Sequence, residues 1–140
     1  MDKSSLYTHR VRYSEVDKMG VVYHSRYIEW FEAARTEMLR EKGLPYRQLE
    51  NDGIMLPVIE VVCRYHSPVR YDDLVFISTT ITKLNRIRLE LAYTLRIENH
   101  DALCVSGLSV HCFVNAEGKP VRADKSLVEF IKKSSLIKEE

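Results

Sequence analysis

The sequence lacks the features that mark several large classes of protein. Five glycines and four prolines among 140 residues are too few for a collagen-like or low-complexity chain. The cysteines are an odd three without a CxxC pair, so we expect reduced thiols and no disulfide framework. No run approaches the roughly 18 apolar residues of a membrane span, and we expect no membrane insertion. Residues 1–17 have no apolar core of a signal peptide, so we expect a cytoplasmic protein.

An excess of charge of one sign is also missing. The chain carries 21 basic and 20 acidic residues, which gives a net charge of +1. Without a one-sign field, binding to nucleic acid is not expected. The histidines and cysteines have no zinc-site spacing, and we expect neither a metal nor a cofactor. A composition of 45% hydrophobic and 29% charged residues is typical of a globular protein, and the length predicts a single domain over residues 1–140.

The hydrophobic pattern changes its period along the chain. Residues 6–13 are rich in β-formers and predict a strand. Residues 26–42 carry apolar side chains three and four positions apart, which predicts a long, mostly buried helix capped by Ser25 and ended by Gly43. Later segments predict a short helix, four strands of period two and a tail helix, within residues 44–55, 56–70, 72–85, 87–99, 102–115 and 123–140.

The order of these elements predicts a layered α+β fold. Strands joined by short connections are expected to be antiparallel neighbours in sequence order. One face of the sheet must be covered, and the helix at residues 26–42 is the only long apolar one. We therefore expect an antiparallel β-sheet wrapped around a long buried central α-helix.

The connection between the first strand and the long helix contains a candidate catalytic group. Asp17 is ionised at pH 7 if its pKa is near the ordinary value of about 3.9, which suits a base or nucleophile. The first N–H groups of the helix beginning near Ser25 carry partial positive charge and can polarise a carbonyl. Gly20 lets the backbone pass close to a ligand. The alternative is that Asp17 only caps a turn.

Two segments resemble one enzyme family. DKMGVVYHSRYIEWFEAAR, residues 17–35, and RYHSPVRYDDLVFI, residues 64–77, are similar to the 4-hydroxybenzoyl-CoA thioesterase-like branch of the hotdog fold. The similarity extends over nearly the whole chain. It implies a homodimer whose sheets join edge to edge, with dimers pairing further into a tetramer. It also implies hydrolysis of a short-chain or aromatic acyl-CoA, with coenzyme A present only as part of the substrate.

The resemblance also implies roles for individual residues. Asp17 is expected to act as nucleophile or general base, and His24 to be catalytic through its amide or its imidazole. The expected substrate-binding residues are Gly20, Val21, Tyr23, Tyr27 and His66. The phosphates of coenzyme A are expected to meet Lys83, Arg86 and Arg88. The alternatives are core packing for Tyr27, a helix-start residue stacked on the sheet for His24, and a purely structural role for His66. Tyr23 is expected to be a pocket wall and not a catalyst, and the basic residues could form a solvated strand end. We expect Glu15 to be a solvated charge near the entrance.

Other functions remain open at this stage. A hotdog dehydratase or hydratase pairs a histidine with a carboxylate across the dimer, and the spacing of Asp17 and His24 does not match that arrangement. A thioesterase acting on acyl carrier protein and an acyl-thioester-binding or assembly module without turnover are further alternatives. The sequence does not decide the acyl group, the thiol carrier, or whether Asp17 attacks directly or activates water.

Overall fold

The computed structural model describes residues 4–137, with side chains described through residue 133. Its elements are β1 (Ser5–Arg10), the 3-10 turn η1 (Tyr13–Glu15), α1 (Arg26–Glu41), α2 (Tyr46–Asn51), β2 (Val58–Tyr65), β3 (Leu74–Leu84), β4 (Arg88–Ile97), β5 (Val105–Cys112) and α3 (Lys125–Ile137). Every predicted element is present, with shifted ends, and the last three positions of the predicted tail helix lie outside the described residues. None of the described helices is long and apolar enough to cross a membrane.

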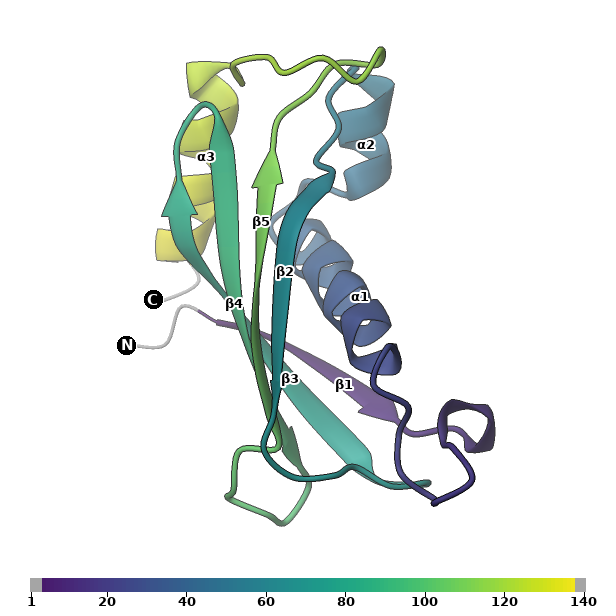
Figure 1. Ribbon diagram of the computed structural model, residues 1–140. Helices are drawn as coiled ribbons and strands as arrows, with labels where there is room; N and C mark the ends of the chain where they lie inside the picture. The colour runs from purple at the N-terminus through teal and green to yellow at the C-terminus, as the bar shows by residue number, and fades with distance from the viewer. Residues whose placement is uncertain (1–3, 138–140) are drawn as a thin grey trace.

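The five strands form one antiparallel sheet in the order β1-β3-β4-β5-β2 (Figure 1). The prediction that consecutive strands are neighbours is confirmed for β3, β4 and β5. It is wrong for β2 and β3, because β2 pairs with β5 at one edge and β3 pairs with β1 near the other. Residues 66–73 are the cause: they cross the end of the sheet instead of closing a hairpin.

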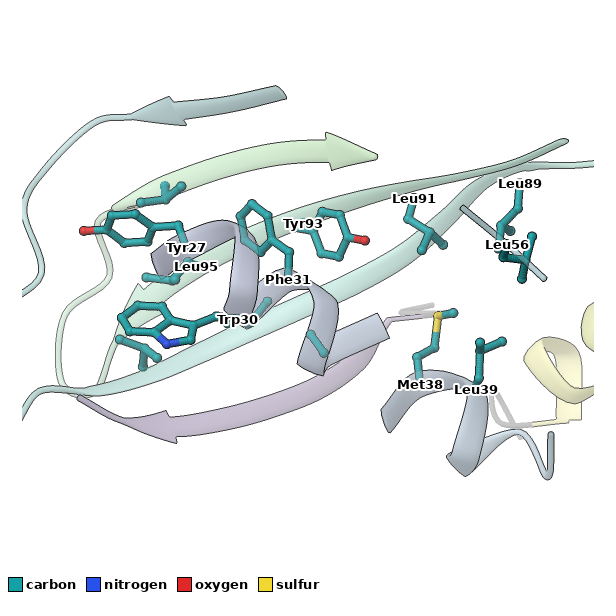
Figure 2. Packing of buried hydrophobic residues seen from close by; sticks show 14 of the residues in the cluster. Tyr27, Trp30, Phe31, Met38, Leu39, Leu56, Leu89, Leu91, Tyr93 and Leu95 are labelled. Carbon is teal, nitrogen blue, oxygen red and sulfur yellow. The ribbon is translucent and has the colours of Figure 1, made fainter. Parts of the chain in front are cut away.

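Helix α1 packs against the sheet along most of its length. Figure 2 shows Tyr27, Trp30, Phe31, Met38 and Leu39 pointing from α1 toward the strands, and all five are buried. The side chains of β4 that face them are also buried: Leu89, Leu91, Tyr93 and Leu95. This interdigitation confirms the predicted α+β architecture with a buried central helix.

The two ends of α1 differ in how well the sequence predicted them. Gly43 has φ +83° and Leu44 N–H donates to Leu39 O at 2.9 Å, which is the predicted glycine stop. Ser25 occupies the N-cap position, but it has helical dihedral angles and its side chain makes no capping hydrogen bond. The predicted N-cap position is therefore confirmed, but the expected capping by the serine side chain is not found. The first turn keeps its N–H groups available for another acceptor.

A row of buried, hydrogen-bonded polar side chains connects β4, β5 and the backbone of Leu56. Tyr93 Oη lies 2.7 Å from Ser109 Oγ, which lies 2.7 Å from His111 Nε2. His111 Nδ1 lies 3.3 Å from Leu56 O, and since a carbonyl only accepts, Nδ1 carries the proton and Nε2 accepts from Ser109. Ser109 and His111 are 1% and 0% exposed. This serine–histidine pair is thus a core network, out of reach of a substrate.

Stability is expected to fall when His111 must be protonated. Burial, followed by the nearby positive charge of Arg35, lowers the pKa of His111 from 6.5 to about 4. Between these values the unfolded chain binds a proton that the folded chain does not, so stability is lost as the pH falls. From pH 7.5 to pH 5 we expect the free energy of unfolding in urea to drop by about 2 kcal/mol. The variant His111→Gln should lose most of this slope, and an unchanged slope would contradict the assignment.

Candidate active site

The connection between β1 and α1 folds back on itself and places Asp17 beside the start of the helix. Asp17 N–H donates to Val21 O at 2.8 Å, and Gly20 N–H donates to Asp17 O at 2.9 Å. Gly20 has φ +82°, a conformation that costs glycine little. Val22 N–H donates to Val69 O at 2.8 Å, which fixes the loop to the segment that follows β2.

The carboxylate of Asp17 has one occupied and one available oxygen. Oδ1 accepts from Met19 N–H at 2.8 Å and lies 3.4 Å from Val21 N. Asp17 therefore does cap its own turn, as the structural alternative proposed. Within residues 4–137 no donor is bonded to Oδ2. The turn orients the side chain and leaves one oxygen for chemistry.

Two backbone N–H groups at the start of α1 have no hydrogen-bond acceptor among residues 4–137. Tyr23 N–H donates to Glu15 O, and Arg26 N–H donates to Tyr23 O. The amides between them, at His24 and Ser25, donate to no group in the described part of the chain. They lie at the positive end of a 16-residue helix. Such donors can bind the oxygen of a polarised carbonyl.

Asp17 and His24 line one cavity of about 420 Å³, and Ser25 directly follows His24 in the chain. Its lining residues are Asp17, Val21, Val22, Tyr23, His24, Tyr27, Tyr65, His66, Ser67 and Pro68. Six of the residues predicted for the catalytic and substrate sites therefore come together. The seventh, Gly20, does not line the cavity but closes the turn of the Asp17 loop through its hydrogen bond to Asp17 O. The segments 17–27 and 65–68, which are far apart in sequence, meet because residues 66–73 cross the end of the sheet.

The aromatic residues of the cavity are held in defined positions. Tyr27 is 3% exposed, and burial raises its pKa to about 12, so the hydroxyl is protonated at pH 7. Tyr65 Oη donates to His24 O at 3.1 Å and thereby supports the first turn of α1. The ring of His24 lies 4.3 Å from that of Tyr23, centroid to centroid. His66 Nε2 lies 3.0 Å from Ser106 Oγ on β5.

Sequence reasoning did not name four of the cavity-lining residues as part of the site: Val22, Tyr65, Ser67 and Pro68. Of these, Tyr65 makes a hydrogen bond to the start of α1. It directly precedes His66 in the RYHSP stretch, so proximity to a predicted residue was the available signal. Its hydrogen bond spans 41 positions along the chain. No local pattern predicts a contact of that length.

The basic residues expected to hold coenzyme A phosphates lie elsewhere. Lys83, Arg86 and Arg88 belong to the β3–β4 hairpin next to α3, at the end of the sheet opposite Asp17 (Figure 1). Arg86 Nε donates to Ala123 O at 2.8 Å, and Arg88 is 3.3 Å from Glu90 Oε2. A single chain does not bring these side chains to the cavity.

The expectation that Glu15 is solvated is wrong. Glu15 is only 8% exposed, and its carboxylate is bonded to Trp30 Nε1, to Arg12 N and to His9 Nε2. Burial alone would raise the pKa of Glu15. The hydrogen bonds outweigh that effect and lower the pKa below its usual value. Glu15 is an ionised group built into the core beneath the Asp17 loop.

Comparison with known proteins places the chain among thioesterases. The model of the thioesterase-like superfamily matches residues 11–132. An acyl-CoA thioester hydrolase, YbgC, from Escherichia coli O6:H1 is 35% identical over 85% of this chain and 89% of its own length. A putative esterase from Aquifex aeolicus is 33% identical over 91% of this chain and 97% of its own. The crystal structure of a DHNA-CoA thioesterase from Staphylococcus aureus superposes with a TM-score of 0.88 at 29% identity, covering 97% and 93% of the two chains.

Proposed function

The chain belongs to the thioesterase-like superfamily, and we propose that it hydrolyses the thioester of a short-chain or aromatic acyl-CoA. It is a thioester hydrolase with the hotdog fold. The choice of acyl group is supported by the size and lining of the cavity. Tyr23, Tyr27 and Tyr65 contribute aromatic walls, which suit a planar ring or a short chain better than a long extended one.

One observation supports this function above the others: Asp17 and His24 line the same cavity. Among the described residues, Asp17 Oδ2 accepts no hydrogen bond and the His24 amide donates none. Hydrolysis requires attack on the carbonyl carbon and stabilisation of the oxyanion that forms. In one route Asp17 attacks, the C–S bond breaks, coenzyme A leaves as a thiolate, and water cleaves the resulting anhydride. In the other route Asp17 takes a proton from water as the water attacks.

Both routes use the same polarising group. The amides at the start of α1 would donate to the thioester oxygen, and the imidazole of His24 would hold the carbonyl or the water. Tyr65 would keep the His24 peptide in place through its hydrogen bond to His24 O. A thiolate is a good leaving group, so no dedicated acid is required. Gly20, Val21, Tyr23, Tyr27 and His66 would bind the acyl and pantetheine portions.

A homodimer, pairing further into a tetramer, is part of the same proposal. The outer edge of β2 pairs with no strand among the described residues, and Val58, Ile59 and Val61 on it are 45%, 50% and 38% exposed. A second β2 would supply the missing backbone partners and cover these side chains. Three basic residues were expected to bind the phosphates: Lys83, Arg86 and Arg88. They lie at the far end of the sheet from the cavity of the same subunit, so this role depends on the cavity of another subunit.

Two further attributes belong to the proposal. Cys63, Cys104 and Cys112 are free thiols, in keeping with a reducing cytoplasmic environment. The two routes described above need no metal and no redox cofactor.

A second candidate is an acyl-thioester-binding module without turnover. The hydrogen bonds from Met19 and Val21 to Asp17 favour it, because a turn-capping carboxylate has a structural role in any case. Binding of acyl-CoA without release of thiol would be its signature.

A thiol-release assay with short-chain, long-chain and aromatic acyl-CoAs tests the proposal. We expect multiple turnovers with at least one short-chain or aromatic substrate, and slower release from long chains. The same acyl groups on acyl carrier protein provide the matched comparison for the carrier. Release from the protein-bound thioester alone would contradict the assignment to coenzyme A, and no release from any substrate would leave the binding module as the better account.

A further inference from the structure

Glu15 joins three elements that surround the proposed catalytic loop. Its Oε1 accepts from Arg12 N–H at 2.8 Å and lies 2.9 Å from His9 Nε2 on β1. Its Oε2 accepts from Trp30 Nε1–H on α1 at 2.9 Å. One buried carboxylate thus connects the edge of the sheet, the turn η1 and the central helix.

The backbone next to Glu15 carries this connection to Asp17. Glu15 O accepts from Tyr23 N–H at 3.0 Å, and Val16 forms a β-bridge with Val22. These bonds close the loop of residues 17–21, and Asp17 is its first residue. On the other side, the ring of Trp30 lies 5.2 Å from that of Tyr27, centroid to centroid, and Tyr27 lines the cavity. A shift of Glu15 therefore moves both the catalytic carboxylate and a wall of the site.

We propose that Glu15 is a positioning residue, which holds Asp17 at the distance from the start of α1 that thioester hydrolysis requires. This inference rests on the proposed function. Glu15 does not line the cavity, so it acts only through the loop and through Trp30. Misplacement of a reacting group by about 1 Å can cost up to 100-fold in rate, so a support of this kind has a measurable effect on kcat.

Only a carboxylate satisfies this arrangement. Two N–H donors, from Arg12 and Trp30, point at two different oxygens. An amide at this position has a single oxygen, so its NH2 group must face one of those donors. Glu15→Gln is nearly isosteric and is thus expected to break one of the two bonds while filling the same volume.

The test combines kinetics with a probe of the contact itself. Trp30 is the only tryptophan in the chain, so one indole N–H resonance reports on the bond to Glu15. In Glu15→Gln we expect this resonance to shift and to exchange faster with solvent. With an acyl-CoA that the wild type hydrolyses, we expect kcat to fall about tenfold while KM changes by less than about threefold. Trp30→Phe should lower kcat similarly, and the double variant should be no slower than Glu15→Gln alone.

A matched control separates positioning from loss of stability. Val128 is buried on α3, which lies at the far end of the sheet from the Asp17 loop (Figure 1). Val128→Ala should lower the melting temperature without changing kcat more than about twofold. If folded Glu15→Gln keeps the wild-type kcat, or if Val128→Ala loses as much, the positioning role is overturned while the proposed function stands. If the wild type hydrolyses no acyl-CoA, the proposed function itself fails, and the positioning role fails with it.

Discussion

Asp17→Asn is expected to lower kcat for acyl-CoA hydrolysis by a factor of about 100 or more, with the protein still folded. An asparagine has the shape of the aspartate, and its Oδ1 can still accept from Met19 and Val21, so the turn is retained. What it loses is the negative charge. Direct attack on the thioester and removal of a proton from water both need that charge, so the expected loss is the same for either route. The measurement is steady-state thiol release with the substrate that the acyl-CoA panel identifies.

Asp72→Asn is the matched control for this variant. Asp72 lies two residues after Arg70, which forms a β-bridge with Val21 of the Asp17 loop, and Arg10 donates to the Asp72 carbonyl. Asp72 does not line the cavity. It has φ 71°, a conformation that asparagine also tolerates well. The same loss of one charge should leave kcat within about twofold of wild type. Equal rates for wild type and Asp17→Asn would remove Asp17 from the mechanism and leave the amide of His24 without a catalytic partner.

Gly107→Ala is expected to destabilise the fold by about 2–3 kcal/mol, because β5 has no room for a side chain there. A Cβ at this position would lie 2.6 Å from Phe31 Cε2 and 2.7 Å from Val62 O. The oxygen belongs to the paired strand β2, and Phe31 is fixed by its stacking on Tyr93 at 4.3 Å between ring centroids. Neither neighbour can move without disturbing α1 or the sheet. Urea unfolding monitored by Trp30 fluorescence would measure the loss.

The neighbouring position offers a control for this substitution. Leu108 lies on the outer face of the same strand and is 40% exposed, so Leu108→Val should change the stability by less than about 0.5 kcal/mol. Combining Gly107→Ala with Phe31→Leu should recover part of the loss, since one of the two close contacts is relieved. A wild-type unfolding midpoint for Gly107→Ala alone would mean that α1 sits less tightly on β5 than the distances indicate.

The parts of the fold that sequence reasoning predicted are those with local causes. The spacing of Tyr27, Phe31, Ala34 and Met38 is set by the helix period, and all four are buried as expected. The turns containing Asn99 and Gly118 have the left-handed conformations that these residues favour. The cluster of Asp17, Tyr23 and His24 in one cavity also has a local origin, since a few residues separate them.

Apart from the absent side-chain cap at Ser25, the errors concern contacts between distant segments. The pairing of β2 with β5 depends on which edge of the sheet is free, and turn residues carry no information on that. Glu15 was expected to be solvated because most carboxylates are. Its burial depends on His9 and Trp30 arriving from two other elements, which the local pattern does not encode. The distance of Arg86 from the cavity likewise follows from the sheet order.

The strand order also determines when this protein can fold during its synthesis. Ser5 of β1 pairs with Thr79 of β3, and Val58 of β2 pairs with His111 of β5. Each edge strand therefore waits for its partner strand until much later residues have left the ribosome. Helix α1 is synthesised after β1 but before the other four strands of the sheet that buries it. The apolar stripe of α1 is thus exposed in the nascent chain until β4 and β5 emerge. A topology with such long-range pairing folds late and as a unit, so a ribosome-bound fragment ending before β5 would expose the surface that the finished enzyme hides.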